Sequence, residues 1–343
     1  MASVGIIANP ASGKDIRRLV AYGICFDNLE KVNIVKRCLL ALAVTGVDRV
    51  VYMPDYYGIV PRAVEGLSKD HHLPMDIVEA DMEMTGTQID SAHAALTMNQ
   101  ADIGCIITLG GDGTNRMVAK NCGDIPLLPI STGTNNVFPQ MVEGTIAGLA
   151  AGVVACGLAD FPAVYPTKKI IIFKNGKPVD MALIDAVVLK DIFIGSRAIW
   201  DEERIRKVVV TRGEPDNIGI SSIAGNLHPI GITEAKGMVI DLGPGNISLL
   251  TPLAPGLIRP IKVADYQILE IGAEVKGVKG PLVIALDGER EVEVGEGEEV
   301  SFKLTFDGPR VVDPRLALRQ AVSKGYSRGK QAIDRLHWLK EEN

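Results

Sequence analysis

The sequence predicts an α/β N-terminal domain with a Rossmann-like parallel sheet, followed by an all-β, sandwich-like second domain. Up to about residue 160, short apolar runs alternate with helix-like segments, as they do in a parallel sheet connected by helices. Beyond that point, short strand-like runs separated by turn signals dominate. The chain has 343 residues, which is too long for one ordinary core, so we expect two domains.

The first domain contains five apolar runs that we predict as buried strands. They are residues 4–8, 49–53, 75–80, 105–108 and 125–130. The helix-like segments are residues 15–22, 28–45, 85–99, 115–121 and 144–156. Loops at the carboxyl ends of parallel strands meet at one edge of the sheet, so the polar loops after residues 8, 108 and 130 should lie close together.

The second part is predicted as short strands joined by turns. The runs are 169–173, 182–189, 207–211, 238–242, 247–251, 261–263, 267–271, 282–286 and 300–305. From Asp313 to residue 340 a helical period returns, and its apolar face needs a core. We therefore expect this C-terminal helix to return to the first domain. The predicted domains are residues 1–160 with 311–343, and residues 161–310.

Composition narrows the function classes. The net charge of −6 gives no global field that favours nucleic acid. The five cysteines are scattered and form no CxxC pair, which argues against zinc and for a reduced, cytoplasmic setting. We see no basic secretory leader, and no apolar run reaches the roughly 20 residues that a membrane span needs.

The most informative motif is Gly110-Gly111-Asp112-Gly113-Thr114, which joins an apolar run to a helix-like segment. Glycines let main-chain N–H groups approach a phosphate closely. An acidic residue there is suited to bind magnesium or to take a proton from a hydroxyl. Asp112 could instead be a helix N-cap, but Thr114 is the better-placed cap. The motif therefore points to phosphoryl transfer.

Two more polar loops follow predicted strands, and either could be an ordinary turn. The first contains Asn9, Ser12, Gly13 and Lys14, and the second contains Thr132, Gly133, Thr134 and Asn135. Lys14 would add a phosphate-compatible charge, although the glycine spacing is not that of a Walker A loop. Their shared edge with the glycine loop favours nucleotide contact. In the second domain, Asp287-Gly288-Glu289 is by default a hairpin turn.

Together these loops resemble the superfamily of NAD kinases, diacylglycerol kinases and sphingosine kinases, whose shared signature matches residues 110–114. Residues 250–260 and 283–289 are similar to segments of NAD kinases. Residues 7–18, 53–55 and 130–139 resemble the subgroup called ATP-NAD kinase-like or acetoin catabolism protein X.

The resemblance implies an α/β nucleotide-binding kinase domain (1–160 and 311–343) and a β-rich acceptor-binding domain (161–310). It implies ATP and Mg²⁺ as cofactors, with transfer of the γ-phosphoryl group to a hydroxyl of NAD or of a smaller metabolite linked to acetoin catabolism. Asp112 would be the catalytic residue or the metal ligand. The nucleotide would be bound by Asn9, Ser12, Gly13, Lys14, Gly110, Gly111, Gly113, Thr114, Thr132, Gly133, Thr134 and Asn135. The acceptor would be bound by Asp185, Asp287 and Glu289.

One departure bears on the acceptor. Where NAD kinases carry an asparagine before an acidic residue, this chain has Ile184 before Asp185. An isoleucine cannot make those hydrogen bonds, so we expect weak or absent activity on NAD itself. The alternatives are a lipid or polyol kinase of the diacylglycerol kinase type, or a non-catalytic nucleotide-binding regulator. We expect a small-molecule substrate and a homodimer or higher homo-oligomer, with no nucleic acid and no membrane span.

Overall fold

The computed structural model describes residues 1–13, 21–68, 73–190 and 204–328. Lys14, most of the helix predicted at 15–22 and the end of the predicted C-terminal helix lie outside the described residues. In the described ranges, no helix combines the length and hydrophobicity that crossing a bilayer requires.

A seven-stranded sheet organises the first part of the chain, in the order β3-β2-β1-β4-β5-β17-β6. Its strands are β1 (Ser3–Ala8), β2 (Arg49–Tyr52), β3 (Asp76–Glu79), β4 (Cys105–Gly110), β5 (Leu127–Ser131), β6 (Val164–Pro166) and β17 (Arg310–Val312). All neighbours are parallel except β17 and β6. β1, β4 and β5 are buried at every position, as expected for strands that are covered on both faces.

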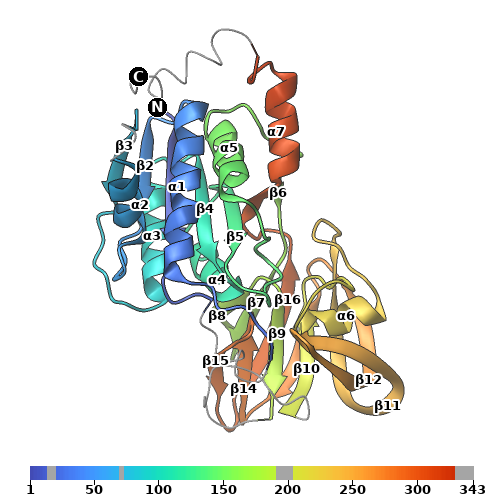
Figure 1. Cartoon of the computed structure of the whole chain (residues 1–343). Helices are drawn as coiled ribbons and strands as arrows, with labels where there is room; N and C mark the ends of the chain where they lie inside the picture. Colours follow the sequence, from blue (N-terminus) through green and yellow to red (C-terminus); the bar gives the residue numbers. More distant parts are fainter. Residues whose placement is uncertain (14–20, 69–72, 191–203, 329–343) are drawn as a thin grey trace.

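Helices cover both faces of this sheet. One face packs against α1 (Asn28–Thr45), α2 (Ile59–Leu67), α5 (Gly144–Ala155) and α7 (Pro314–Ser323). The other packs against α3 (Ile89–Gln100) and α4 (Asp112–Ala119). α7 joins the core through Ala317 and Ala321, beside α5 (Figure 1). The prediction that the C-terminal helix returns to the first part is thereby confirmed.

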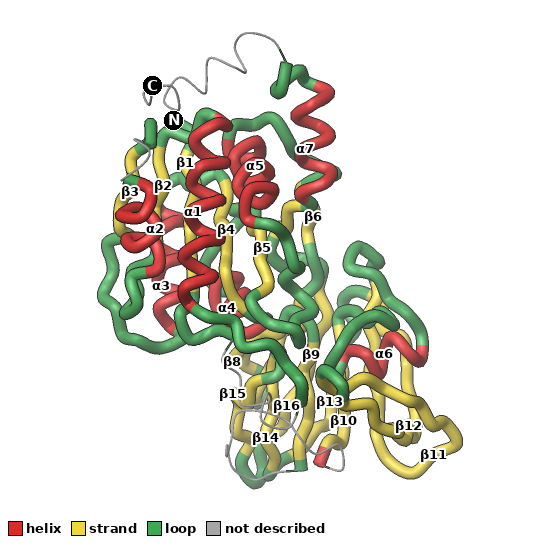
Figure 2. The backbone as a smooth tube through the Cα atoms, in the orientation of Figure 1, coloured by secondary structure: helices red, strands yellow, loops and turns green. Residues whose placement is uncertain are grey.

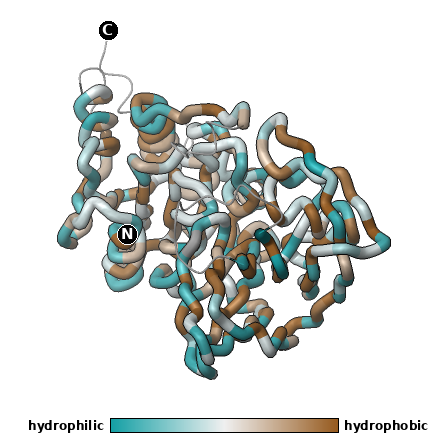
Figure 3. Tube along the Cα trace, turned by 90° about the horizontal axis from the view of Figure 1, so that it is seen from below, coloured by the Kyte–Doolittle hydropathy of each residue, from teal (hydrophilic) through white to brown (hydrophobic). Residues whose placement is uncertain are grey.

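The rest of the chain forms two antiparallel sheets packed face to face. The larger has the order β12-β11-β10-β9-β14-β15 and the smaller β13-β16-β7-β8. The elements are β7 (Lys169–Lys174), β8 (Lys177–Ala182), β9 (Asp185–Leu189), β10 (Ile205–Val210), α6 (Ser221–Leu227), β11 (Lys236–Ala254), β12 (Leu257–Glu270), β13 (Glu274–Lys279), β14 (Leu282–Leu286), β15 (Glu289–Val294) and β16 (Glu299–Thr305). Side chains such as Ile172, Val188, Ile284 and Phe302 fill the space between them. β16 alternates buried residues with more exposed ones, and Figure 3 shows hydrophobic and hydrophilic stretches interspersed along the chain.

Two strand predictions in this part are wrong in detail. The four runs predicted between residues 238 and 271 form one long hairpin of β11 and β12, which Figure 2 shows at the edge of the sheet. The turn signals near Gly245 are absorbed by an irregularity in the pairing of the two strands. The run predicted at 182–189 is interrupted between β8 and β9, because the backbone there bonds a side chain instead of a strand.

Candidate active site

A cavity of about 630 Å³ lies between the carboxyl edge of the parallel sheet and the β region. This volume is within the usual range for small-molecule sites. The predicted site residues on its wall are Asn9, Ser12, Gly13, Gly111, Asp112, Gly113, Thr114, Gly133, Thr134, Asn135, Asp185, Asp287 and Glu289. Gly110 ends β4 and the buried Thr132 follows β5, so both belong to the loops that build the wall without lining it.

The glycine loop admits close neighbours on both sides. A Cβ atom on Gly111 would come within 2.8 Å of Asn136 Oδ1, and one on Gly113 would come within 2.9 Å of Glu289 Oε1. Real Cβ atoms do not approach other atoms so closely, so a side chain at either position would have to displace its neighbour. The glycines therefore bring the loop after β5 and the turn after β14 against the backbone that starts α4.

Asp112 is the first residue of α4, where the helix dipole favours a negative charge. Its carboxylate accepts hydrogen bonds from the amide of Phe138 at 2.7 Å and from that of Val137 at 3.1 Å. Asp112 is half-buried and lies on the cavity wall. The loop after β5 therefore fixes the direction of this carboxylate.

The interpretation of Thr114 as the helix cap is wrong. Gly111 has an extended conformation and is the N-cap, so α4 begins two residues before Thr114. The hydroxyl of Thr114 accepts a hydrogen bond from Asn9 Nδ2 at 2.9 Å instead. Thr114 therefore joins the loop after β1 to the glycine loop.

The three sheet loops are tied together by further hydrogen bonds. The hydroxyls of Ser12 and Thr132 lie 2.9 Å apart. The ammonium group of Lys31 donates to the carbonyl oxygens of Asn9 and Ser12, at 2.8 Å each. Lys31 was missed in the sequence analysis, although it falls on the apolar stripe of α1 with Val32 and could have been found there. This buried cation lies beneath the loop after β1.

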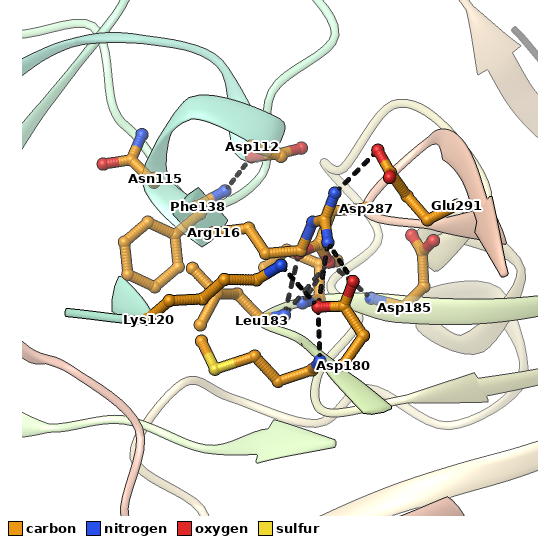
Figure 4. A network of polar contacts seen from close by, with 12 residues as sticks. Asp112, Asn115, Arg116, Lys120, Phe138, Asp180, Leu183, Asp185, Asp287 and Glu291 are labelled. Carbon is orange, nitrogen blue, oxygen red and sulfur yellow. Dashed lines mark hydrogen bonds and ion pairs between the residues drawn. The ribbon is translucent and has the colours of Figure 1, made fainter. Parts of the chain in front are cut away.

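A second cation missed by sequence, Arg116, joins α4 to the β region (Figure 4). Its fully buried guanidinium lies 3.1 Å from Asp180 Oδ1, 2.9 Å from Glu291 Oε1 and 3.9 Å from Asp287 Oδ2. Burial by itself lowers the pKa of Arg116, but these carboxylates raise it overall. Arg116 therefore stays charged, and it links the two halves of the site.

Asp287 borders the cavity, but its carboxylate is used to hold neighbouring backbone in place. It has a φ of 50° in the turn between β14 and β15, which confirms the hairpin interpretation. Its carboxylate accepts from the amides of Leu183, Ile184 and Asp185, at 2.9, 2.7 and 3.2 Å. Burial raises the pKa of Asp287 to about 6, while Arg116 and the amides oppose that rise.

The isoleucine at position 184 does not shape the acceptor side of the cavity, contrary to what the sequence suggested. The Ile184 side chain is buried in a cluster with Phe138, Leu183 and Val311, and it does not line the cavity. Two buried polar atoms on the wall, Asn135 Oδ1 and Ser221 Oγ, have no hydrogen-bond partner among the described residues. Such atoms are costly unless a ligand or water satisfies them.

Over the described ranges, no three His, Cys, Asp or Glu side chains gather as a ready-made metal site. Mg²⁺ is commonly held by one or two carboxylates together with substrate phosphates, and Asp112 is one such carboxylate at the glycine loop.

Two protein-family models match this chain. Residues 4–158 match the ATP-NAD kinase N-terminal domain, and residues 168–307 match the acetoin catabolism protein X C-terminal domain. Acetoin catabolism protein X of Cupriavidus necator is 41% identical over 330 residues, which cover 93% of this chain and 92% of that protein. The chain belongs to the acetoin catabolism protein X family, as the resemblance predicted.

More distant relatives share less of the sequence. The NAD kinase of Natranaerobius thermophilus is 21% identical over 243 residues, covering 68% of this chain and 80% of that one. Among solved structures, yeast NADH kinase complexed with NADH matches with a TM-score of 0.48 and 13% identity, covering 96% of this chain and 89% of the other. A diacylglycerol kinase from Bacillus anthracis matches with a TM-score of 0.44 and 12% identity, covering 92% and 98%.

Proposed function

We propose that this protein is an ATP-dependent kinase that transfers the γ-phosphoryl group to a hydroxyl of a small metabolite. The observation that carries the proposal is the position of Asp112. It starts a helix at the glycine loop, two backbone amides fix it, and it lies on the cavity wall between the two halves of the site. Phosphoryl transfer depends mainly on this kind of positioning and on charge neutralisation.

The nucleotide would occupy the side of the cavity formed by the sheet loops. Gly111 and Gly113 line the cavity without a Cβ atom, which fits the close approach of phosphate oxygens to backbone amides. Asn135 offers an amide oxygen that needs a donor, which an adenine amino group or a ribose hydroxyl would supply. Bound Mg²⁺, held by Asp112 and the phosphates, would neutralise charge on the transferred group.

The acceptor would occupy the side formed by the β region. Asp185, Ser221 and Glu289 line the wall there with polar side chains. In the alternative role, as a base instead of a metal ligand, Asp112 would take the proton from the acceptor hydroxyl as it attacks. Several polar groups within one wall favour a compact polyhydroxylated acceptor over a lipid. The name of the 41% identical relative links the proposal to acetoin catabolism.

Two measurements test the proposal. In the first, Mg·ATP should raise the melting temperature, because a ligand at 100 times its Kd stabilises the native state by about 2.7 kcal/mol. The Gly110→Ala substitution should reduce this shift, because its Cβ would come within 2.5 Å of Thr114 Cβ, a short side chain that ties the glycine loop to Asn9. Gly231→Ala is the matched control, since a Cβ there meets nothing closer than 3.5 Å. Absence of a shift in the wild type would contradict the nucleotide site.

The second measurement is a screen for ATP-dependent phosphorylation of NAD, NADH, polyols, ketoses and lipids. Ser221→Ala should lower kcat/KM for the true acceptor while the ATP-induced shift remains. An ATP-induced shift without transfer to any acceptor would favour a nucleotide-binding regulator. Efficient phosphorylation of NAD would overturn the expectation of a smaller acceptor.

A further inference from the structure

One turn of the chain, formed by Val137 and Phe138, is held from two sides. On one side its two amides donate to the carboxylate of Asp112. On the other, the carbonyl oxygen of Val137 accepts a hydrogen bond from Arg212 Nη2 at 2.8 Å. The guanidinium carbon of Arg212 also lies 5.5 Å from the centre of the Phe138 ring, within the range of a cation–π contact.

The backbone around Arg212 is anchored in the β region. Just after β10, the amide of Thr211 donates to the carbonyl oxygen of Ile184 at 2.9 Å. On the other side, Gly213 exchanges two backbone hydrogen bonds with Ile230. Arg212 thus extends from a fixed point of the β region to a turn of the parallel-sheet region, and its side chain has little freedom to move.

The environment of Arg212 is not that of a solvated surface cation. Only 8% of the residue is exposed, and burial lowers its pKa. The charged and titratable groups around it are Asp112, Tyr165, Asp287, Glu214 and the cation Lys168. A desolvated cation is costly, and here its hydrogen bond goes to a main-chain carbonyl of the turn that holds Asp112.

We propose that Arg212 is a positioning residue that sets the place of Asp112 by holding the 137–138 turn from the β region. The inference rests on the proposed function of Asp112, and it adds a dependence of that residue on the junction between the two regions. Because a displacement of about 1 Å can cost about a hundredfold in rate, loosening this turn should matter to turnover.

The test compares Arg212→Met, Arg212→Lys and a control in the full-length protein by amide hydrogen exchange. In Arg212→Met, the amides of Val137 and Phe138 should exchange at least about tenfold faster, while amides of β1 and β4 stay protected. Arg212→Lys retains a cation and should restore part of the protection. Lys207→Met is the control, because Lys207 is a cation of β10 in the same region and its ammonium group pairs with Asp241.

Kinetics supply the second readout. Arg212→Met should lower kcat by about ten- to a hundredfold with little change in the KM for ATP. Unchanged exchange at residues 137 and 138 in Arg212→Met, or equal changes in Lys207→Met, would overturn the inference. If the exchange responds as expected but the wild type phosphorylates no acceptor, the proposed function fails while the positioning of Asp112 by Arg212 stands.

Discussion

Asp112 in the parallel-sheet region and Asp287 in the β region are both held by hydrogen bonds from backbone amides. Each precedes a glycine, and each carboxylate accepts hydrogen bonds from consecutive amides of a neighbouring loop. For Asp112 these are the amides of Val137 and Phe138, and for Asp287 they extend from Leu183 to Asp185.

What differs is the remainder of the environment. Asp287 is 6% exposed, accepts hydrogen bonds from three amides and has Arg116 within 3.9 Å, so it belongs to the buried contacts between the two regions. Asp112 is half-buried at a helix N-terminus on the cavity wall. An Asp-Gly pair alone therefore does not determine the role of its aspartate. Burial and the neighbouring cation decide whether the carboxylate serves structure or chemistry.

The largest difference between the two aspartates should come from replacing each with asparagine. Asp112→Asn should lower turnover at least about a hundredfold, because a missing base or magnesium ligand costs that much. Its melting temperature should change little, since an asparagine oxygen can still accept from Phe138. Asp287→Asn should show the reverse pattern, with a lower melting temperature and a smaller loss of turnover. Wild-type turnover by Asp112→Asn on the true acceptor would break the assignment.

The next effect concerns the cation on which the Asp287 environment depends. Arg116→Met should lower the free energy of unfolding by about 3 to 5 kcal/mol, because it removes the cation beside the buried Asp287 and the half-buried Glu291, whereas Asp180 keeps Lys120. The control is Arg37→Met, which removes an exposed cation from Glu30 and Glu143 and should cost about 0 to 1 kcal/mol. Urea unfolding of both variants measures the difference. Equal costs would show that the buried cluster contributes no more than a surface pair.

The sequence predicted the parallel-sheet region and its loops well, because glycines and apolar runs act locally. The loops containing Asn9, Asp112 and Asn135 line one cavity, as their shared sheet edge required. The buried cations were not predicted. Arg116 and Arg212 look like ordinary surface residues in the sequence, and only contacts distant along the chain reveal their burial.

The β region was predicted less accurately for a related reason. The hairpin of β11 and β12 is held by pairing on both sides of the irregularity between Leu242 and Ile247, which overrides the turn signals inside it. The interruption between β8 and β9 depends on Asp287, about a hundred residues further along the chain. No local pattern contains that information.

A third, smaller effect tests whether the residue at position 184 takes part in acceptor binding. Because the Ile184 side chain is buried away from the cavity, Ile184→Asn should not create activity on NAD. It should instead destabilise the protein by about 2 to 4 kcal/mol through a lost apolar side chain and a buried amide. Ile184→Val is the control, at about 0.5 to 1.5 kcal/mol. NAD phosphorylation by a stable Ile184→Asn variant would place this residue in the acceptor site after all.

A final expected effect is a pH dependence of stability that comes from Asp287. Burial raises the pKa of Asp287 from 3.8 to about 6, so between these values the folded state keeps a proton that the unfolded state has released. The stabilisation from this group is therefore full below about pH 4 and is lost as the pH rises toward 6. At about 1.4 kcal/mol per pKa unit, the change is on the order of 3 kcal/mol.

Measuring the free energy of unfolding across this window in the wild type and in Asp287→Asn isolates the contribution. The advantage of the wild type over the variant should shrink as the pH rises from about 4 to about 6, and it should then stay constant. An advantage that grows over this window would mean that Arg116 and the three amides outweigh burial and hold the pKa of Asp287 below its ordinary value. The two aspartates would then differ only in access to the cavity and not in the electrostatic cost of their burial.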